Sequence, residues 1–200
     1  YMVGNVLIDN IRFLQQRMQR PAVMDEEHLE EGKYMLLTLN RKAIVNNIEE
    51  MKKLISTIDG VARKAGIKVL APLRGKALGF VLAFKAYQDV ADHQSGIMVV
   101  HPQGYLDFSY LAAHAMGVIT DSGNVAEEAT FNGVPCITLN SYTEHLETVT
   151  VGTNELVAED PEKLQQAMEK IVKGEWKKAG IPDRWDGRSA ERIVQIICGE

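Results

Sequence analysis

The chain has 200 residues, of which 46% are hydrophobic and 24% are charged, and its formal net charge is −5. A chain of this length can bury a sizeable core, and the composition is ordinary for a globular protein. There is no basic stripe of the kind that nucleic-acid-binding surfaces need, and no apolar run approaches the roughly 20 residues of a membrane span. We therefore expect no nucleic-acid or membrane partner, and a cytoplasmic location.

The cysteines exclude two further classes of site. Cys136 and Cys198 lie far apart, with no CxxC or histidine spacing around them, so the sequence predicts neither a metal site nor a disulfide scaffold. Cys136 lies in an apolar segment and is expected to be a buried thiol rather than a nucleophile. The first residues, Tyr-Met-Val-Gly-Asn, suggest a piece cut from a longer protein.

The first part of the chain alternates between helical and extended patterns. Apolar residues recur at helical spacing over residues 5–18, and residues 20–33 form an acidic, turn-rich surface connection. Residues 34–39 are a continuous apolar run, short enough for a buried parallel strand. Residues 44–65, with Ile48 among the apolar residues of one face, predict a second helix.

The alternation continues to the end of the chain. Further strands are predicted at residues 67–71, 97–100, 117–120, 136–139 and 155–158, and further helices around 78–86, over 106–115 and 125–132, and from 161 onward. Residues 140–154 are expected to form a polar loop and residues 174–188 a linker. The last helix, residues 189–198, is predicted to be capped by Ser189. Its apolar face holds three isoleucines to bury: Ile193, Ile196 and Ile197.

Six apolar strands that alternate with helices specify an α/β fold. Because crossovers between parallel strands are right-handed and each strand is hidden on both sides, the pattern predicts a Rossmann-like parallel sheet with helices on both faces. Ligands of such sheets bind beyond the carboxyl ends of the strands. Candidate site residues are therefore expected just after the predicted strands.

The stretch 117–139 has the pattern strand, tight turn, helix, short turn, strand. The turn before the helix supplies small and polar residues: Ser122, Gly123 and Asn124. A helix N-terminus has free N–H groups and a positive dipole end, so this turn is a candidate anion site. Glu127 and Glu128 lie far enough into the helix to accept hydrogen bonds from sugar hydroxyls, which suggests a nucleotide-sugar pocket. The alternative is an ordinary capped helix, with Glu128 as a surface carboxylate.

Residues near other strand ends complete the candidate site. Arg41 and Arg74 each follow a strand and are candidates to meet phosphate or hydroxyl oxygens, the alternative being a surface ion pair. Tyr105 and Phe108 stand near a helix start, so one ring is a candidate to flank a flat base, although aromatics at this spacing also suit a core. His145, on the loop after the central stretch, is a candidate anion donor, the alternative being a solvated side chain.

Taken in order, these segments resemble the C-terminal domain of the non-hydrolysing UDP-N-acetylglucosamine 2-epimerases over nearly the whole chain. The matching residues are Gly4-Asn5 with Ile8-Asp9, Gly104-Tyr105-Leu106-Asp107-Phe108, Thr120-Asp121-Ser122-Gly123 with Glu127-Glu128, Gly133 with Pro135, Gly152-Thr153-Asn154, Asp160-Pro161, and Asp186-Gly187 with Ser189-Ala190-Glu191-Arg192-Ile193. The Ser-Gly turn with its paired glutamates is fairly specific, and the ordered set is a strong signature.

The resemblance implies the C-terminal half of a two-domain fold of the glycosyltransferase-B type. It implies a UDP-binding domain over residues 1–186, and a C-terminal helix within residues 187–200 that packs toward an N-terminal domain absent from this chain. The partners implied are UDP or a UDP-sugar and that missing domain. A homodimer is an open possibility for the full-length protein.

At the site, the resemblance implies Phe108 against the uracil, Glu128 on the ribose, and Ser122 with Gly123 at the diphosphate. It implies an isomerase of cell-surface polysaccharide biosynthesis. In that family UDP is eliminated from the sugar to give a 2-acetamidoglucal and is then added back, which inverts C2. No metal or redox cofactor is implied. The family's proton-transferring carboxylates lie in its N-terminal domain, so this chain alone is expected to bind without turnover.

Three positions depart from the family's motifs. Asn40 stands where the family has a histidine, Ala43-Ile44 where it has Glu-Asn, and His145 where it has an arginine. These positions face the diphosphate and sugar, so nucleotide recognition is better supported than the sugar or the reaction. Two alternatives stay open: a nucleotide-sugar glycosyltransferase or hydrolysing epimerase of the same fold, and a UDP-sugar sensor that has lost catalysis.

Overall fold

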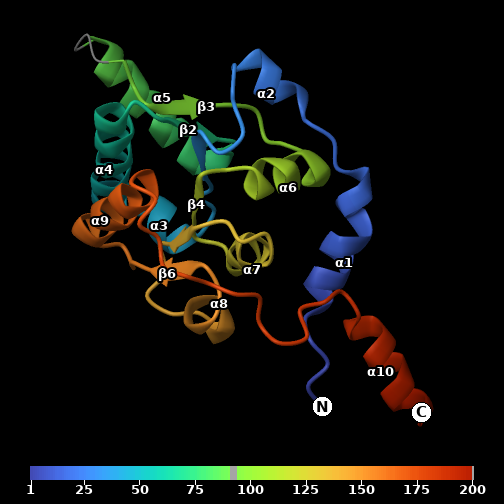
Figure 1. The fold of residues 1–200 in the computed structure, drawn as a ribbon. Coiled ribbons are helices and arrows are strands. Elements are labelled where there is room, and N and C mark those ends of the chain that lie inside the picture. The colour runs from blue at the N-terminus through green and yellow to red at the C-terminus, as the bar shows by residue number, and fades with distance from the viewer. Residues whose placement is uncertain (91–93, 200) are drawn as a thin grey trace.

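The computed structural model describes residues 1–90 and 94–199, and it contains a six-stranded parallel sheet (Figure 1). The strands are β1 (Tyr34–Leu37), β2 (Lys68–Ala71), β3 (Ile97–Val99), β4 (Gly117–Thr120), β5 (Cys136–Thr138) and β6 (Asn154–Leu156). They lie in the order β3-β2-β1-β4-β5-β6, and every neighbouring pair is parallel. The predicted α/β fold is confirmed, and each strand ends within two residues of its expected bounds.

Helices connect the strands and cover both faces of the sheet. They are α1 (Val6–Leu14), α2 (Ala22–Glu26), α3 (Lys42–Val45), α4 (Ile48–Ala65), α5 (Gly75–Val90), α6 (Tyr105–Ala113), α7 (Gly123–Phe131), α8 (Leu146–Thr150), α9 (Pro161–Val172) and α10 (Ser189–Cys198), with a 3-10 turn at Gln15–Arg17. Figure 1 shows α4, α5 and α9 on one side of the sheet and α1, α6 and α7 on the other. In the described part of the chain, no helix is both long and apolar enough to cross a membrane.

Alternate residues of strands β1 to β5 contribute to two separate hydrophobic cores. On β1, Met35 and Leu37 pack with α4, α5 and α9, whereas Tyr34 and Leu36 pack with α2, α6 and α7. Successive side chains of a strand point to opposite faces, so a strand covered by helices on both sides must be apolar throughout. All four of these side chains are fully buried, which accounts for the continuous apolar run in the sequence.

The prediction of one helix over residues 44–65 is wrong, because the segment forms two helices. α3 ends at Val45 with Asn46 as its C-cap, and the next residue, Asn47, has an extended backbone and caps α4 by accepting from the N–H of Glu50. Such a cap satisfies one of the free N–H groups with which every helix begins. Ile48 is the first residue of α4 and is 67% exposed, so it does not belong to the buried face.

Two segments that were expected to be irregular contain short helices. α2 interrupts the connection over residues 20–33, and its Val23 and Met24 are buried in the core shared with α6 and α7, so the connection is not confined to the surface. α8 lies within the expected loop over residues 140–154, and its Thr148 is fully buried. Each of these helices has five residues, too few to show a helical period in the sequence. Tertiary packing stabilises them.

The segments near the two termini meet at one end of the molecule (Figure 1). The carboxylate of Asp9, on α1, accepts hydrogen bonds from the backbone N–H groups of Ser189 (3.0 Å) and Ala190 (2.7 Å). The prediction that Ser189 caps the last helix is therefore wrong. Ser189 is the first helical residue of α10, and the capping carboxylate comes from α1.

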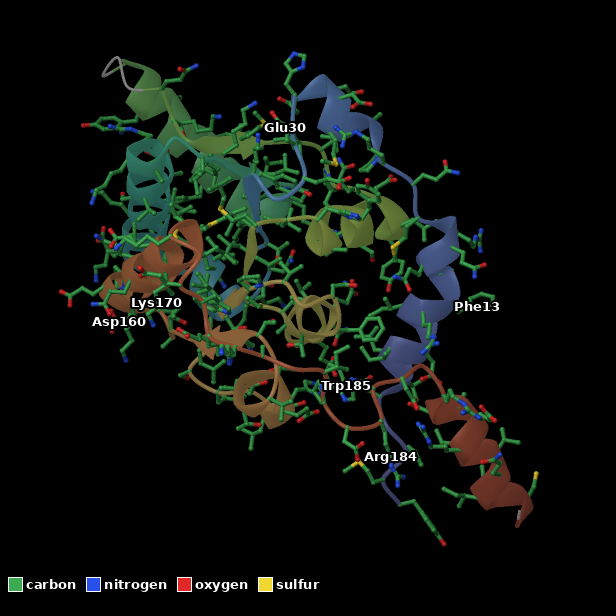
Figure 2. All side chains as sticks on the ribbon, in the orientation of Figure 1. Phe13, Glu30, Asp160, Lys170, Arg184 and Trp185 are labelled. Atoms are coloured by element: carbon green, nitrogen blue, oxygen red, sulfur yellow. The ribbon has the colours of Figure 1, made fainter. Side chains whose placement is uncertain are left out.

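α10 projects from the body of the protein beside the N-terminal segment (Figure 1). The isoleucines that the last helix has to bury are not all covered in this chain: Ile197 is 78% exposed and Ile196 is 36% exposed, whereas Ile193 is half-buried. The linker that leads to α10 is anchored by Trp185, labelled in Figure 2, which is buried with Ile8 of α1.

Candidate functional site

The candidate site lies where the order of the strands reverses. β1 and β4 are neighbours in the sheet, yet the chain continues from them toward opposite edges, and ligands of open α/β sheets bind at such a point. Asp121 follows β4 directly and joins the two loops, since its Oδ2 accepts from the backbone N–H of Asn40 (2.7 Å) and of Arg41 (2.6 Å). Asp121 is buried, so it holds the loops together rather than meeting solvent.

A cavity of about 310 Å³ opens beside these loops. Its lining comes from the segments after β1, β2, β3 and β4: Thr38, Leu39, Asn40, Pro72, Leu73, Arg74, Gln103, Tyr105, Phe108, Ser122 and Val125. Four of the predicted site residues are thus brought together, namely Arg74, Tyr105, Phe108 and Ser122. Tyr105 is 41% exposed and Phe108 is half-buried against the core of α6 and α7, so both rings border the cavity.

The helix that follows β4 begins without a side-chain cap. Ser122 occupies the N-cap position of α7, but its side chain makes no capping hydrogen bond. The backbone N–H of Ser122 instead donates to Oγ1 of Thr120 (3.0 Å), which holds the turn. The N–H groups from Gly123 onward and the positive end of the helix dipole therefore stay available to an anion. This is the geometry that the predicted anion site requires.

Glu128 is a buried carboxylate between α6 and α7, so the alternative of a surface carboxylate is wrong. It is 4% exposed, and its Oε2 accepts from the hydroxyl of Ser109, on α6 (3.2 Å). Burial raises the pKa of Glu128, the hydrogen bond from Ser109 lowers it, and the charge of Glu127 raises it. Ser109 orients the carboxylate, and no sequence pattern links positions 109 and 128.

Glu127 joins α7 to two other elements. Its Oε1 accepts from Nδ2 of Asn5, the N-cap residue of α1, and lies 3.1 Å from Nδ1 of His145, the N-cap residue of α8. Burial raises the pKa of Glu127, while His145 and Asn5 lower it. The alternative that His145 is a solvated loop residue is therefore wrong, because its ring is held against a buried carboxylate.

Six predicted site residues lie outside the cavity lining: Gly123, Glu127, Glu128 and His145, described above, and also Arg41 and Asn124. The guanidinium of Arg41 donates to Oδ1 of Asn140 (2.9 Å) and to the hydroxyl of Tyr142 (3.1 Å), so it ties the loop after β1 to the loop after β5. These partners are uncharged, and the alternative of a surface ion pair does not describe them. Asn124 is exposed in the first turn of α7. Within residues 1–90 and 94–199, no three His, Cys, Asp or Glu side chains are grouped to hold a metal ion.

Comparison with known proteins identifies a family. A family model described as UDP-N-acetylglucosamine 2-epimerase matches residues 1–198. The UDP-N-acetylglucosamine 2-epimerase of Methanococcus maripaludis is 31% identical over 209 residues, which cover 100% of this chain and 55% of the relative. That of Methanocaldococcus jannaschii is 32% identical over 203 residues, covering 98% and 54%. The chain spans about half the length of the curated relatives it matches, and it corresponds to their C-terminal half.

A solved structure shares the same fold. The crystal structure of Methanocaldococcus jannaschii UDP-GlcNAc 2-epimerase in complex with UDP-GlcNAc and UDP is similar with a TM-score of 0.79 and 32% identity. The match covers 100% of this chain and 55% of that chain.

Proposed function

Because the chain belongs to the UDP-N-acetylglucosamine 2-epimerase family, as its ordered motifs predict, we propose that it is the nucleotide-binding half of an enzyme that interconverts UDP-N-acetylglucosamine and UDP-N-acetylmannosamine. UDP leaves C1 while a base removes the C2 proton, and UDP then adds back to C1 while C2 takes a proton on the opposite face, which inverts C2. One observation carries the proposal: an uncapped helix N-terminus and two aromatic rings border a cavity where the strand order reverses, and a buried carboxylate, Glu128, lies further along the same helix. The similar structure that holds UDP-GlcNAc and UDP supports this class of ligand.

Each part of a UDP-sugar has a counterpart in the proposed site. Phe108 borders the cavity and offers a flat face on which uracil stacks. Glu128 accepts the two neighbouring ribose hydroxyls, which requires its ionised form. The N–H groups after Ser122, from Gly123 onward, bind the diphosphate, and Arg74 adds positive charge from the loop after β2.

The groups that transfer protons are not among these residues. Of the described residues that line the cavity, none is acidic, and Asn40 supplies an amide that does not titrate. We therefore assign the catalytic carboxylates to the half of the relatives that this chain does not span. In this proposal the chain by itself binds the nucleotide and does not turn it over.

The exposed face of α10 is proposed to contact that other half. The face consists of Val194, Ile196 and Ile197. Burial of apolar surface stabilises a contact by about 25 cal/mol per Å². Residues 1–186 then form the UDP-binding domain, and residues 187–200, of which the structure describes 187–199, pack toward the second domain. A cytoplasmic location and a homodimer of the full-length protein complete the proposal.

Calorimetry of this chain with UDP tests the site assignment. Phe108→Ala removes the stacking surface and Glu128→Ala removes the ribose acceptor. Each is expected to weaken UDP binding about tenfold or more, since loss of a base–aromatic stack alone costs ~1–3 kcal/mol. Tyr87→Ala truncates an exposed ring of α5 outside the cavity lining and is the matched control, with unchanged affinity. Unaltered binding in both site variants would remove the assignment.

Turnover separates the proposed isomerase from its alternatives. The full-length protein, incubated with UDP-N-acetylglucosamine and followed by NMR, is expected to invert C2 while the nucleotide-sugar persists. Sugar transfer with C2 untouched would indicate a glycosyltransferase, and release of free UDP with the epimerised sugar would indicate a hydrolysing epimerase. Binding without turnover, with turnover gained by Asn40→His, would indicate a sensor that has lost catalysis.

A further inference from the structure

Glu128 receives fewer hydrogen bonds than an ionised carboxylate can accept. Its side chain is buried, and within the described part of the chain its one hydrogen bond comes from the hydroxyl of Ser109 to Oε2, at 3.2 Å. A carboxylate has about four acceptor positions, and a buried acceptor that lacks partners costs free energy. Most of the accepting capacity of Glu128 is therefore left for another molecule.

The two oxygens of this carboxylate have different surroundings. Oε2 is held by Ser109 across the contact between α6 and α7. Oε1 has no hydrogen-bond partner among the described residues, and it is not one of the side-chain atoms that the fold encloses without a partner. Oε1 is therefore the oxygen that a ligand can reach.

Ser109 and Glu128 lie next to residues that line the cavity. Ser109 directly follows Phe108 on α6, and Glu128 comes one helical turn after Val125 on α7. Phe108 and Val125 both line the cavity, as does Tyr105. Burial and the charge of Glu128 raise the pKa of Tyr105. The charge of Glu128 thus acts at the cavity, although its side chain is not part of the lining.

We propose that Ser109 is a positioning residue for the ribose: it holds Oε2 of Glu128 so that Oε1 is directed to the cavity, and the chain thereby distinguishes a ribonucleotide from a deoxyribonucleotide. The inference rests on the proposed function, because it needs a uridine nucleotide in the cavity. A ribose offers two neighbouring hydroxyls that donate to a carboxylate, and a sugar without them offers none there. A carboxylate that is already fixed loses less freedom when the ribose binds, so more of each hydrogen bond contributes to affinity.

The surroundings of Ser109 suit this role. Its side chain is 1% exposed, so water does not compete for the hydroxyl. A serine inside a helix commonly donates to a carbonyl of its own helix one turn earlier. The hydroxyl of Ser109 instead donates to Glu128 on the neighbouring helix, so the packing of α6 on α7 sets the position of the carboxylate.

Calorimetry of the chain with UDP and with 2′,3′-dideoxyuridine diphosphate tests the proposal. The second probe has the same base and the same diphosphate and lacks both ribose hydroxyls. Ser109→Ala is expected to weaken the binding of UDP about tenfold, the loss that follows from one hydrogen bond to a charged group. The variant is expected to bind the dideoxy probe as wild type does. Equal weakening of both probes would indicate a role in packing alone and would overturn the inference.

Three further variants separate the hydrogen-bond donor from the packing. Ser109→Thr keeps the hydroxyl and is expected to keep the preference for UDP over the dideoxy probe. Ser109→Cys keeps a side chain of similar size whose S–H is a weak donor, and it is expected to behave as the alanine variant does. Ser189→Ala is the matched control, with unchanged affinity for both probes, because it removes an equally buried hydroxyl that has no partner in the described chain.

A double-mutant cycle shows whether Ser109 acts through Glu128. In the Glu128→Ala background, Ser109→Ala is expected to cause no further loss of affinity for UDP, because the group that it positions is already absent. A further loss as large as the one measured with Glu128 present would overturn the inference.

The possible outcomes distinguish this inference from the proposed function. If wild type prefers UDP to the dideoxy probe, and Ser109→Ala and Ser109→Cys keep this preference in full, the inference is overturned and the proposed function stands. If neither probe binds to a wild-type chain that circular dichroism shows to be folded, the proposed function fails and the inference fails with it.

Discussion

Asp9 and Ser189 lie 180 residues apart in the sequence, and the carboxylate of Asp9 accepts a hydrogen bond from the backbone N–H of Ser189 at 3.0 Å. A second bond, from the N–H of Ala190, completes the cap. The last helix is thus held by a charge on the first helix, which also matches the positive end of the α10 dipole.

Asp9→Ala is expected to loosen α10 and to lower the free energy of unfolding by about 1 kcal/mol, the usual value of an N-cap. Hydrogen exchange of the α10 amides, with thermal unfolding, measures both effects. Glu162→Ala removes an exposed acid from the first turn of α9 and is the matched control. Unchanged protection of α10 in Asp9→Ala would contradict the capping role.

The space beside Cα of Gly96, just before β3, is too small for a methyl group. A Cβ at this position would lie 2.6 Å from Cβ of Ala62, on α4. Gly96→Ala is therefore expected to force β3 and α4 apart and to destabilise the protein by about 1–3 kcal/mol. Gly60→Ala, in an exposed and open part of α4, is expected to stabilise it by about 0.5–1 kcal/mol. Urea denaturation measures both, and equal stability of Gly96→Ala and wild type would refute the close approach.

Asp121 supports the two loops of the candidate site. Asp121→Ala leaves the backbone N–H groups of Asn40 and Arg41 without their acceptor. The expected cost is about 2–3 kcal/mol in the free energy of unfolding, together with weaker UDP binding. Asp121→Asn keeps an oxygen acceptor in place and is expected to retain most of the stability and most of the affinity for UDP. If alanine and asparagine were equally stable in chemical denaturation, these bonds would not hold the loops.

Glu128→Gln is expected to stabilise the fold and to weaken ligand binding. Burial raises the pKa of Glu128, so the folded chain binds a proton here more readily than the unfolded chain does. This carboxylate therefore costs stability when ionised, and the cost disappears as the pH falls and the group is protonated. Removing the charge is expected to raise the free energy of unfolding near pH 7, and to weaken UDP binding.

Thermal unfolding of Glu128→Gln at about pH 5 and about pH 8 measures this effect, and the gain is expected to be larger at the higher pH. Glu175→Gln, at an exposed position of the linker, is the matched control. If the variant were less stable than wild type at the higher pH, ionised Glu128 would not destabilise the folded chain.

The two thiols are expected to react at very different rates. Cys136 is fully buried in β5, and burial raises its pKa to about 12, whereas Cys198 is exposed on α10. The native chain is expected to react quickly with a thiol reagent at Cys198 alone, since only the thiolate is nucleophilic. Mass spectrometry locates the label, and Cys198→Ser is expected to abolish the fast reaction. Rapid native labelling of Cys136 would contradict its burial.

Much of the fold follows from local patterns. The apolar run that becomes β1 predicts a strand hidden on both faces, because a side-chain period of two leaves no face for solvent. The Asp160-Pro161 pair marks the start of α9, where Asp160 accepts from the N–H groups of Glu162 and Lys163. Each signal lies within a few residues of the structure it specifies, so the sequence alone is sufficient.

Some features of the candidate site could likewise be predicted from neighbouring residues, and others could not. The Ser-Gly turn before α7 and its position after a strand were predictable, because both depend on neighbouring residues. The sequence motifs also indicated the family. The burial of Glu128 beneath Ser109, the contact of His145 with Glu127 and the cap on α10 were decided by tertiary structure alone. These contacts join elements whose proximity depends on strand order and helix packing, and the period of a single segment carries no information about either.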